Sequence, residues 1–413
     1  MRRCVAFFLL AAILCSFSKK VLVYSVTFRQ PVVNRYNGKH FPLLAKTENA
    51  RQIELPSISR QSTGSDLVQP PPIESQNDPA DATALVTACE KIREQVGRVV
   101  VGQDAVIEQL LIAILARGHC LLEGVPGLAK TLMVHTLADS MDLSFRRIQF
   151  TPDLMPGDIT GTEIIQEDPE TGRRNFVFER GPVFTQMLLA DEINRAAPKV
   201  QGALLEAMQE RKITIGNENF PLPAPFLVIA TQNPIEQSGT FELPEAQLDR
   251  FMLCHRLTYP TPDEEKEILR RNSALGIRRQ DKGAVARTEF DILDDQPVGT
   301  AEDLITCMHA VQDVHVSDVF MDHVVELVNR TRIHPALEVG CSPRAGIALL
   351  KSSRARALIN GRHYVVPEDM YSLAEDVILH RIRLNYEALA DGLTGQSVLH
   401  SIMSEMGLTT STI

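Results

Sequence analysis

The chain has 413 residues, of which 44% are hydrophobic and 23% are charged, and this composition excludes a collagen, a polytopic membrane protein and a wholly disordered chain. A formal net charge of -10, no Trp and only six Tyr argue against nucleic acid as the main partner, because nucleic-acid binders need basic surfaces and stacking rings. The seven cysteines form no CxxC pair, so reduced thiols are expected instead of a disulfide framework or a zinc site. The length suggests about two or three domains.

The first residues leave three readings open. Two arginines precede an apolar run from Cys4 to Phe17, as in a signal peptide, but the run is short for a membrane span and no clear cleavage site follows. Residues 1–18 are therefore a signal-like segment, a short anchor, or the product of a start codon assigned too far upstream. Residues 19–82 include three prolines at 70–72 and have poor hydrophobic periodicity, which predicts a disordered linker.

Helical and strand-like apolar spacings alternate over residues 83–260. Helical spacing is found over 85–96 and 105–116. Continuous apolar runs, typical of parallel strands buried on both faces, predict an α/β domain with a sheet flanked by helices. The runs lie at Cys120–Leu122, Ile148–Phe150, Met187–Ala190 and Phe226–Ala230.

Strand signals fade after about residue 262, and helical periods predict a smaller all-α domain over 261–413. The helices are expected at 264–271, 301–311, 319–331, 343–359 and 367–386.

A glycine-bearing loop follows the first apolar run and opens a helix, which is the arrangement of a phosphate-binding loop. Its glycines let backbone N–H groups turn toward phosphate oxygens, and the helix N-terminus adds partial positive charge. Lys130 is expected to reach the β- and γ-phosphates, and the Thr131 hydroxyl to bind Mg²⁺. The residues expected to touch the nucleotide here are Gly124, Val125, Pro126, Gly127, Leu128, Ala129, Lys130 and Thr131.

Ala129 departs from the general pattern, which has Gly immediately before the Lys. A methyl group is tolerable at this position if its backbone φ is helical, and this condition is an expectation about the loop.

Polar residues follow two of the later strands. Asp191 and Glu192 end the run Met187–Ala190, where Asp191 would hold Mg²⁺ and Glu192 would act as general base on the attacking water. Asn233 follows the run at 226–230, where its amide would orient that water. The alternatives are a simple acidic cap for the first pair and a turn residue before Pro234 for Asn233.

Two arginines complete the predicted site. Arg250, in Leu-Asp-Arg-Phe, would reach the γ-phosphate of a neighbouring subunit, and Arg344, in Ser-Pro-Arg-Ala, would reach the nucleotide of its own subunit. Each would otherwise be an ordinary solvated surface charge.

The order of these motifs resembles the AAA+ superfamily, and specifically its MoxR-type branch, over roughly residues 83–390. Alanine at position 129 is usual in that branch. The matching segments are residues 100–103, 121–132, 149–154, 181–184, 190–195, 203–210, 230–234, 245–251 and 342–345.

The resemblance implies a AAA+ phosphate-loop domain with a parallel sheet, followed by an α-helical lid, and it implies roles for individual residues. Lys130 and its loop match Walker A, Asp191 with Glu192 matches Walker B, and Asn233 matches sensor 1. Arg250 matches the arginine finger, Arg344 matches sensor 2, and Val101 with Gly102 matches the segment that borders the adenine.

The family forms rings, usually hexameric, with ATP and Mg²⁺ at the subunit interfaces. It remodels or matures client proteins, often ones with a von Willebrand factor A domain. Residues 153–180, with an Asp-Pro-Glu-Thr-Gly turn at 168–172, resemble the family's helix-2 insert, and residues 212–222 resemble its pre-sensor hairpin. Both segments would face the partner, or would be ordinary surface hairpins.

The resulting hypothesis is a Mg²⁺-dependent ATPase that remodels a protein partner. An ATP-gated assembly scaffold with little turnover is the alternative, and a nucleic-acid motor is disfavoured by the acidic charge. Because hydrolysis needs cytoplasmic ATP, we expect a cytoplasmic protein whose start codon was assigned too early, although residues 1–18 leave membrane association open.

Overall fold

The computed structural model describes residues 79–167, 174–216, 218–235, 239–275, 277–280, 283–286 and 297–407. The expected N-terminal segment, most of the expected linker and the turn at 168–172 lie outside these ranges. No helix within them is long and apolar enough to cross a membrane.

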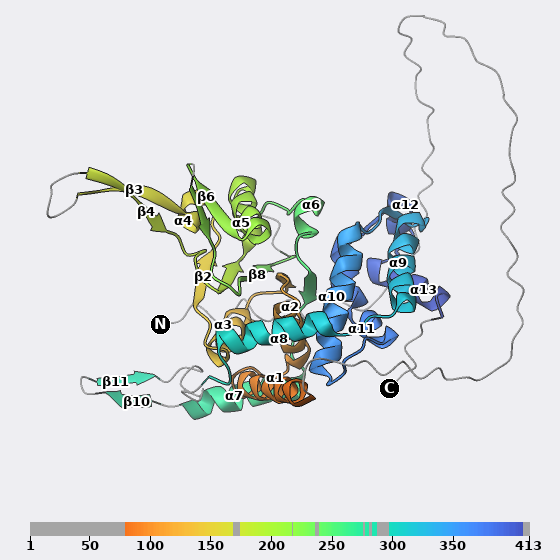
Figure 1. The fold of residues 1–413 in the computed structure, drawn as a ribbon, viewed down its shortest axis with the longest axis horizontal. Helices are drawn as coiled ribbons and strands as arrows, with labels where there is room; N and C mark the ends of the chain where they lie inside the picture. Colours follow the sequence, from red (N-terminus) through yellow and green to blue (C-terminus); the bar gives the residue numbers. More distant parts are fainter. Residues whose placement is uncertain are drawn as a thin grey trace, which may run out of the picture. The chain divides into compact units, whose positions relative to one another are not determined.

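A five-stranded parallel sheet lies at the centre of the α/β part of the chain (Figure 1). Its strand order is β2-β5-β8-β1-β9. The four apolar runs that predicted strands all lie in it, whereas the edge strand β9 was missed. Its four residues carry His255 and Arg256 and therefore do not read as an apolar run. The bounds are β1 Cys120–Glu123, β2 Phe145–Gln149, β5 Met187–Asp191, β8 Leu227–Gln232 and β9 Leu253–Arg256.

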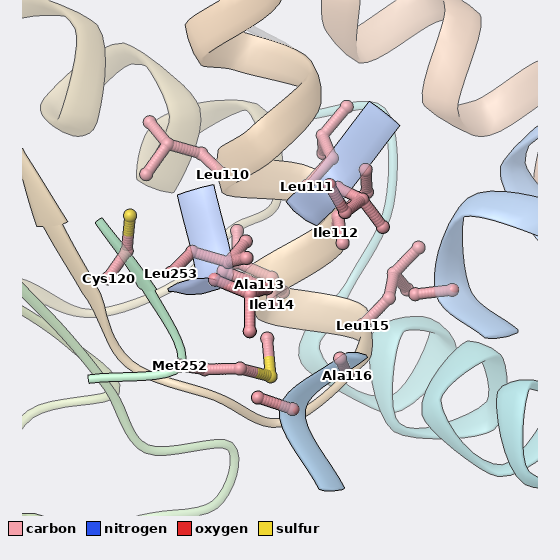
Figure 2. Packing of buried hydrophobic residues seen from close by; sticks show 14 of the residues in the cluster. Leu110, Leu111, Ile112, Ala113, Ile114, Leu115, Ala116, Cys120, Met252 and Leu253 are labelled. Atoms are coloured by element: carbon pink, nitrogen blue, oxygen red, sulfur yellow. The ribbon is translucent and has the colours of Figure 1, made fainter. Parts of the chain in front are cut away.

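Side chains alternate between the two faces of this sheet, as the pleat of a strand requires. In β1, Cys120 and Leu122 join one buried cluster and Leu121 joins the other. Helices α1 (Pro79–Val99), α2 (Asp104–Leu115) and α3 (Lys130–Ser140) contribute to the first cluster, and α5 (Pro198–Glu210) contributes to the second. The expected α/β architecture is therefore confirmed. Figure 2 shows the buried residues of α2, from Leu110 to Leu115, beside Met252 and Leu253.

Two antiparallel hairpins leave this layered core between β2 and β8. Helix α4 (Pro156–Thr160) leads into β3 (Gly161–Glu167), which pairs with β4 (Arg174–Arg180). After α5, β6 (Lys212–Ile215) pairs with β7 (Glu218–Pro221). The hairpin expected over 212–222 is therefore present, and the insert at 153–180 is a short helix followed by a longer hairpin (Figure 1).

The C-terminal part is mainly helical, as expected, and its helices share the first cluster with α1 and α2. It also contains two short strand pairs that the helical periods did not predict, β10–β11 and β12–β13. The helix expected to run to Tyr386 ends at Ile378, since a 3-10 turn and β13 follow.

The bounds of the helices in this part are α7 Pro262–Leu275, α8 Ala301–Asp313, α9 Asp318–Ile333, α10 Pro343–Ile359, α11 Pro367–Ile378, α12 Tyr386–Ala390 and α13 Gly395–Glu405. The strands are β10 Ile277–Gln280, β11 Gly283–Ala286, β12 Leu337–Val339 and β13 Arg383–Leu384.

Candidate functional site

The carboxyl ends of the central strands bring most of the predicted residues to one edge of the sheet. The phosphate loop follows β1, Asp191 ends β5, and Asn233 comes directly after β8. In the parallel registry Glu123 lies opposite Gln232, and Gln149 lies opposite Asp191. In open parallel sheets this edge is where ligands bind.

Lys130 is the first residue of α3, with Thr131 beside it in the first turn. The Lys130 Nζ donates to the carbonyl oxygen of Gly124 at 2.7 Å, so the ammonium group is held over its own loop. Burial lowers the pKa of Lys130, while the nearby carboxylates of Asp191 and Glu192 raise it. The ammonium group therefore lies within electrostatic reach of the acidic pair, as a phosphate-binding lysine requires.

Ala129 corrects the expectation of a helical backbone before the lysine, because its φ is +55° and its ψ is 23°. This is the left-handed region, which costs a residue with a Cβ roughly 1–2 kcal/mol. The general pattern has glycine at this position because glycine adopts a left-handed backbone without strain, whereas Ala129 adopts it with strain. Gly127 is also left-handed, with φ +88°, and a Cβ there would meet nothing within 4 Å.

The segment expected to border the adenine lies between α1 and α2, and it packs against the start of α7. Gly102 has φ +73°, and a Cβ there would come within 2.5 Å of the Glu264 carboxyl group. At the start of the phosphate loop, a Cβ on Gly124 would come within 3.0 Å of Leu257. These glycines therefore allow Glu264 of α7 to approach the segment that includes Val101, and Leu257 to approach the phosphate loop.

The acidic pair is held by residues that the sequence reading did not assign. The Thr231 hydroxyl donates to Asp191 Oδ1 at 2.6 Å and accepts from the Glu192 N–H at 2.9 Å. The Gln149 amide donates to Glu192 Oε2 at 2.6 Å, and Arg195 pairs with the same oxygen at 3.0 Å. Thr231 and Gln149 are polar residues at the ends of strands, and this position is the sequence feature that could have identified them as partners of the acidic pair.

A divalent cation at Asp191 would have to compete with a cationic partner, because Oδ2 already accepts a hydrogen bond from Arg147. Arg147 Nη2 lies 2.6 Å from Asp191 Oδ2, and the Asp191 residue is buried. The Thr131 hydroxyl and the Asp191 carboxylate are hard oxygen donors of the kind that Mg²⁺ prefers. Within the described ranges, no group of three or more His, Cys, Asp and Glu side chains is arranged to hold a metal. Mg²⁺ usually takes its remaining ligands from phosphates and water.

Asn233 is buried at the expected place, and it also has the turn role that was the alternative. Its Oδ1 accepts a hydrogen bond from the Ile235 N–H at 3.2 Å. The side chain is thereby fixed at the carboxyl end of β8, between the strands that carry the loop and the acidic pair.

Arg250 and Arg344 lie together at the opposite edge of the sheet. Both line a cavity with Gly118 and His119, which precede β1, and with Met252, which precedes β9. Arg344 faces Asp249 at 3.8 Å, and Arg250 Nη1 donates to the Leu205 carbonyl at 2.8 Å. This cavity lies before β1 and the phosphate loop lies after it. The four residues of β1 span roughly 13 Å at 3.3 Å per residue. Arg344 therefore lies at the amino end of β1 in this structure, and its contact with the nucleotide of its own subunit stays a prediction.

The sequence matches the profile of the ATPase family associated with various cellular activities (AAA) over residues 119–253, and that of the AAA lid domain over residues 329–402. It is 44% identical to chaperone MoxR1 of Mycobacterium tuberculosis over 325 residues, which cover 79% of this chain and 83% of the relative.

The chain belongs to the MoxR family of AAA+ ATPases.

A second MoxR-named relative and a solved structure are also similar to the chain. Protein MoxR of Methylorubrum extorquens is 31% identical, with 74% of this chain and 91% of the relative covered. A crystal structure of a candidate ATPase from Cytophaga hutchinsonii is 42% identical with a TM-score of 0.70, and the match covers 79% of this MoxR-family chain and 96% of that one.

Proposed function

We propose that this MoxR-family protein hydrolyses ATP with Mg²⁺ in an oligomeric ring, usually a hexamer in this family, and that it remodels or matures a partner protein. The observation that carries this proposal is that the phosphate loop with Lys130, after β1, and the acidic pair Asp191 and Glu192, at the end of β5, lie at the carboxyl ends of strands of one parallel sheet. The name of the M. tuberculosis relative, a chaperone, supports the remodelling role. A client with a von Willebrand factor A domain and a cytoplasmic location belong to the same proposal.

Each residue at this edge would have one task. The loop amides and Lys130 would bind the triphosphate, and Thr131 with Asp191 would hold Mg²⁺, which neutralises phosphate charge and orients the γ-phosphate. Glu192 would accept a proton from water, and Asn233 would orient that water. The contacts of Glu192 with Gln149 and Arg195 both use Oε2, so Oε1 would be the oxygen that accepts the proton from the water.

Arg250 and Arg344 would act on a nucleotide bound to a neighbouring copy. Their position at the amino ends of the strands, away from the phosphate loop of the same chain, supports a role in trans for both. A cation supplied from the next subunit makes hydrolysis depend on assembly, because the transition-state charge is neutralised only in the ring.

Phosphate release tests this proposal against the alternative of an ATP-gated scaffold. Wild type should release phosphate steadily, whereas Glu192→Gln should bind ATP and lose at least about 100-fold in rate, as expected for loss of a general base. Glu387→Gln removes an exposed carboxylate on α12 and should behave as wild type. Equal near-zero rates in wild type and Glu192→Gln would favour the scaffold.

A further inference from the structure

Arg147 is an arginine at the sheet edge that carries the candidate site, and the proposed function gives it no task. It lies on β2, the outermost strand of the sheet, two residues before Gln149. Side chains two residues apart on a strand point to the same face, so these two approach the end of β5 together. In the parallel registry Gln149 lies opposite Asp191, and Arg147 lies opposite Leu189. The strand therefore places a guanidinium group beside the acidic pair.

One nitrogen of this guanidinium group joins two side chains of the site. Arg147 Nη2 lies 2.6 Å from Asp191 Oδ2 and 2.6 Å from Gln149 Oε1. The terminal nitrogens of a guanidinium group carry two N–H groups each, so Nη2 can donate to both oxygens at once. The Nε–H donates to the same Asp191 oxygen at 3.1 Å. Arg147 thus holds a carboxylate and an amide in a fixed relation to each other.

The hydrogen bond from Arg147 fixes the direction in which the Gln149 amide faces. Because Oε1 accepts from the guanidinium group, Nε2 points the other way and donates to Glu192 Oε2 at 2.6 Å. A flipped amide would set its oxygen against the Glu192 carboxylate and its NH2 group against the guanidinium group, so both contacts would become repulsive. Hydrogen bonds therefore connect Asp191 with Glu192 through Arg147 and Gln149.

Arg147 also occupies part of the Asp191 carboxylate. An ionised carboxylate has about four positions at which it can accept a hydrogen bond or a cation. Oδ2 accepts both donors of Arg147, and Oδ1 accepts the Thr231 hydroxyl at 2.6 Å. A divalent cation at Asp191 would meet the like charge of Arg147 within a few ångströms, and this repulsion weakens its binding. The contact that lowers metal affinity is thus also the first link of the connection to Glu192.

We propose that Arg147 is a positioning residue for hydrolysis, and that it couples the metal carboxylate of Asp191 to the general base Glu192 through Gln149. The inference rests on the proposed function, because it needs a metal at Asp191 and a water at Glu192. The guanidinium group lowers the affinity of this edge for the metal. Through the Gln149 amide it keeps Glu192 Oε2 engaged, so that Oε1 serves the water.

The first experiment uses the opposite signs of these two effects. Arg147→Met removes the charge and all donors. Its affinity for Mn²⁺, a spectroscopic substitute for Mg²⁺, should rise by at least about fivefold when measured by electron paramagnetic resonance with ADP present, because a like charge is removed. Its kcat for phosphate release should fall by roughly 10–100-fold, as is usual when an outer partner of a metal site is removed, while KM for ATP stays unchanged.

Two variants serve as controls. Arg146→Met removes the same charge one residue earlier, from an exposed side chain on the opposite face of β2, and should match wild type in metal affinity and in kcat. Arg147→Lys keeps the charge but loses the planar fork, so its Mn²⁺ affinity should stay close to that of wild type while its kcat stays low. A lower Mn²⁺ affinity in Arg147→Met would indicate a merely structural role and would overturn the proposal.

The second experiment tests whether the coupling passes through Gln149. Gln149→Met breaks the same connection at the amide and should lower kcat about as much as Arg147→Met does. The double variant should lose no more than either single variant, because both substitutions break one connection. Losses that multiply would show that the two side chains act independently, and the coupling would then be refuted.

The inference and the proposed function fail in different ways. A wild type that releases no phosphate would refute the proposed function, and Arg147 would then have no reaction to serve. An active wild type beside an Arg147→Met chain with unchanged kcat and Mn²⁺ affinity would refute the inference alone. The Arg147 side chain is 46% exposed, and exposed ion pairs add little to stability, so unfolding should not obscure either result.

Discussion

Two residues of the candidate site, and one at the opposite ends of the strands, have left-handed backbone conformations. Ala129 has φ +55°, Glu192 has φ +57° and Arg211 has φ +54°. Such conformations cost about 1–3 kcal/mol each and persist where the surrounding structure imposes them. Here Ala129 and Glu192 lie beside the expected phosphate and water positions, and Arg211 lies in the cavity that Arg250 and Arg344 also line.

Ala129→Gly should stabilise the protein slightly. Glycine relieves roughly 1–2 kcal/mol of left-handed strain but adds roughly 0.4–1 kcal/mol of backbone entropy to the unfolded chain, so a net gain of about 0.5–1 kcal/mol is expected. Urea unfolding measures the change. Ala129→Val, with a branched side chain, should destabilise by more than the glycine stabilises. A destabilised Ala129→Gly chain would contradict the strain argument.

His119 should make stability depend on pH. Its Nε2–H donates to the Met208 carbonyl at 3.1 Å, the Val228 N–H donates to its Nδ1 at 3.0 Å, and burial lowers its pKa to about 4. The folded state therefore prefers neutral imidazole, while the unfolded chain takes a proton below about pH 6.5. The stability from His119 is fully present above pH 6.5 and is lost as pH falls toward 4.

The expected loss for His119 is about 3 kcal/mol over that interval. The free energy of unfolding of wild type and of His119→Gln should be measured at several pH values from 7.5 to 4.5. The difference between the two proteins reports the titration of His119, because the carboxylates are common to both. Curves that stay parallel through this interval would show that His119 does not titrate on unfolding.

At the scale of elements, the two hairpins are joined by an aromatic contact at the base of the longer one. The Phe178 ring on β4 lies 4.5 Å from the Phe220 ring on β7 and 5.7 Å from the Phe184 ring. Further along β4 and on the same face, Phe176 is 74% exposed. One aromatic residue thus anchors the hairpin, and the other is presented to solvent.

Phe178→Ala should loosen the β3–β4 hairpin and lower stability by about 1–3 kcal/mol, since it removes packed aromatic surface. Amide hydrogen exchange over Gly161–Glu167 and Arg174–Arg180 should speed up. Phe176→Ala is the matched control and should change stability by less than about 0.5 kcal/mol. Similar exchange in both variants would mean that the aromatic contact does not anchor the hairpin.

For the whole molecule, a buried arginine connects the helical part to the sheet. Arg381 donates from Nε to Asp249 Oδ1 at 2.9 Å, from Nη2 to the Phe251 carbonyl at 2.6 Å, and from Nη1 to the carbonyls of Met252 and Val377. Burial lowers the pKa of Arg381, and its hydrogen bond to Asp249 opposes that shift. One side chain therefore donates to backbone carbonyls just before β9 and to the Asp249 carboxylate, which lines the same cavity as Arg250 and Arg344.

Arg381→Met should destabilise the protein by about 3–5 kcal/mol, because it leaves buried acceptors without their charged donor. Calorimetry should show a lower melting temperature, with the helical part unfolding separately. Arg383→Met removes an exposed arginine two residues away and serves as the control. A single unshifted transition would show that Arg381 does not couple the two parts.

Assembly gives the last prediction at this scale. Arg250→Ala should keep ATP binding, since the phosphate loop is distant, and should lose on the order of 10³-fold in turnover if the arginine acts in trans. Nucleotide binding and phosphate release, measured on the same preparation, separate the two effects. Full turnover in Arg250→Ala would remove Arg250 from the catalytic machinery.

The sequence by itself was enough to predict the strand–loop–helix around Lys130, the acidic pair at the end of β5, and the alternation that makes a parallel sheet. These features are local, because apolar runs and glycine-bearing turns follow from short-range backbone and burial preferences. The short strand β9 and the pairs β10–β11 and β12–β13 carry too few or too polar residues to be read this way.

Only the tertiary structure decided what depends on contacts between distant segments. It paired Thr231 with Asp191 and Gln149 with Glu192, gave Ala129 a left-handed backbone, and moved Arg344 to the edge that holds Arg250. The position of a side chain on an outer helix depends on how that helix packs on the sheet, and one-dimensional spacing contains no such information. For that reason the phosphate loop could be found in the sequence, whereas the cavity that brings Arg250 and Arg344 together could not.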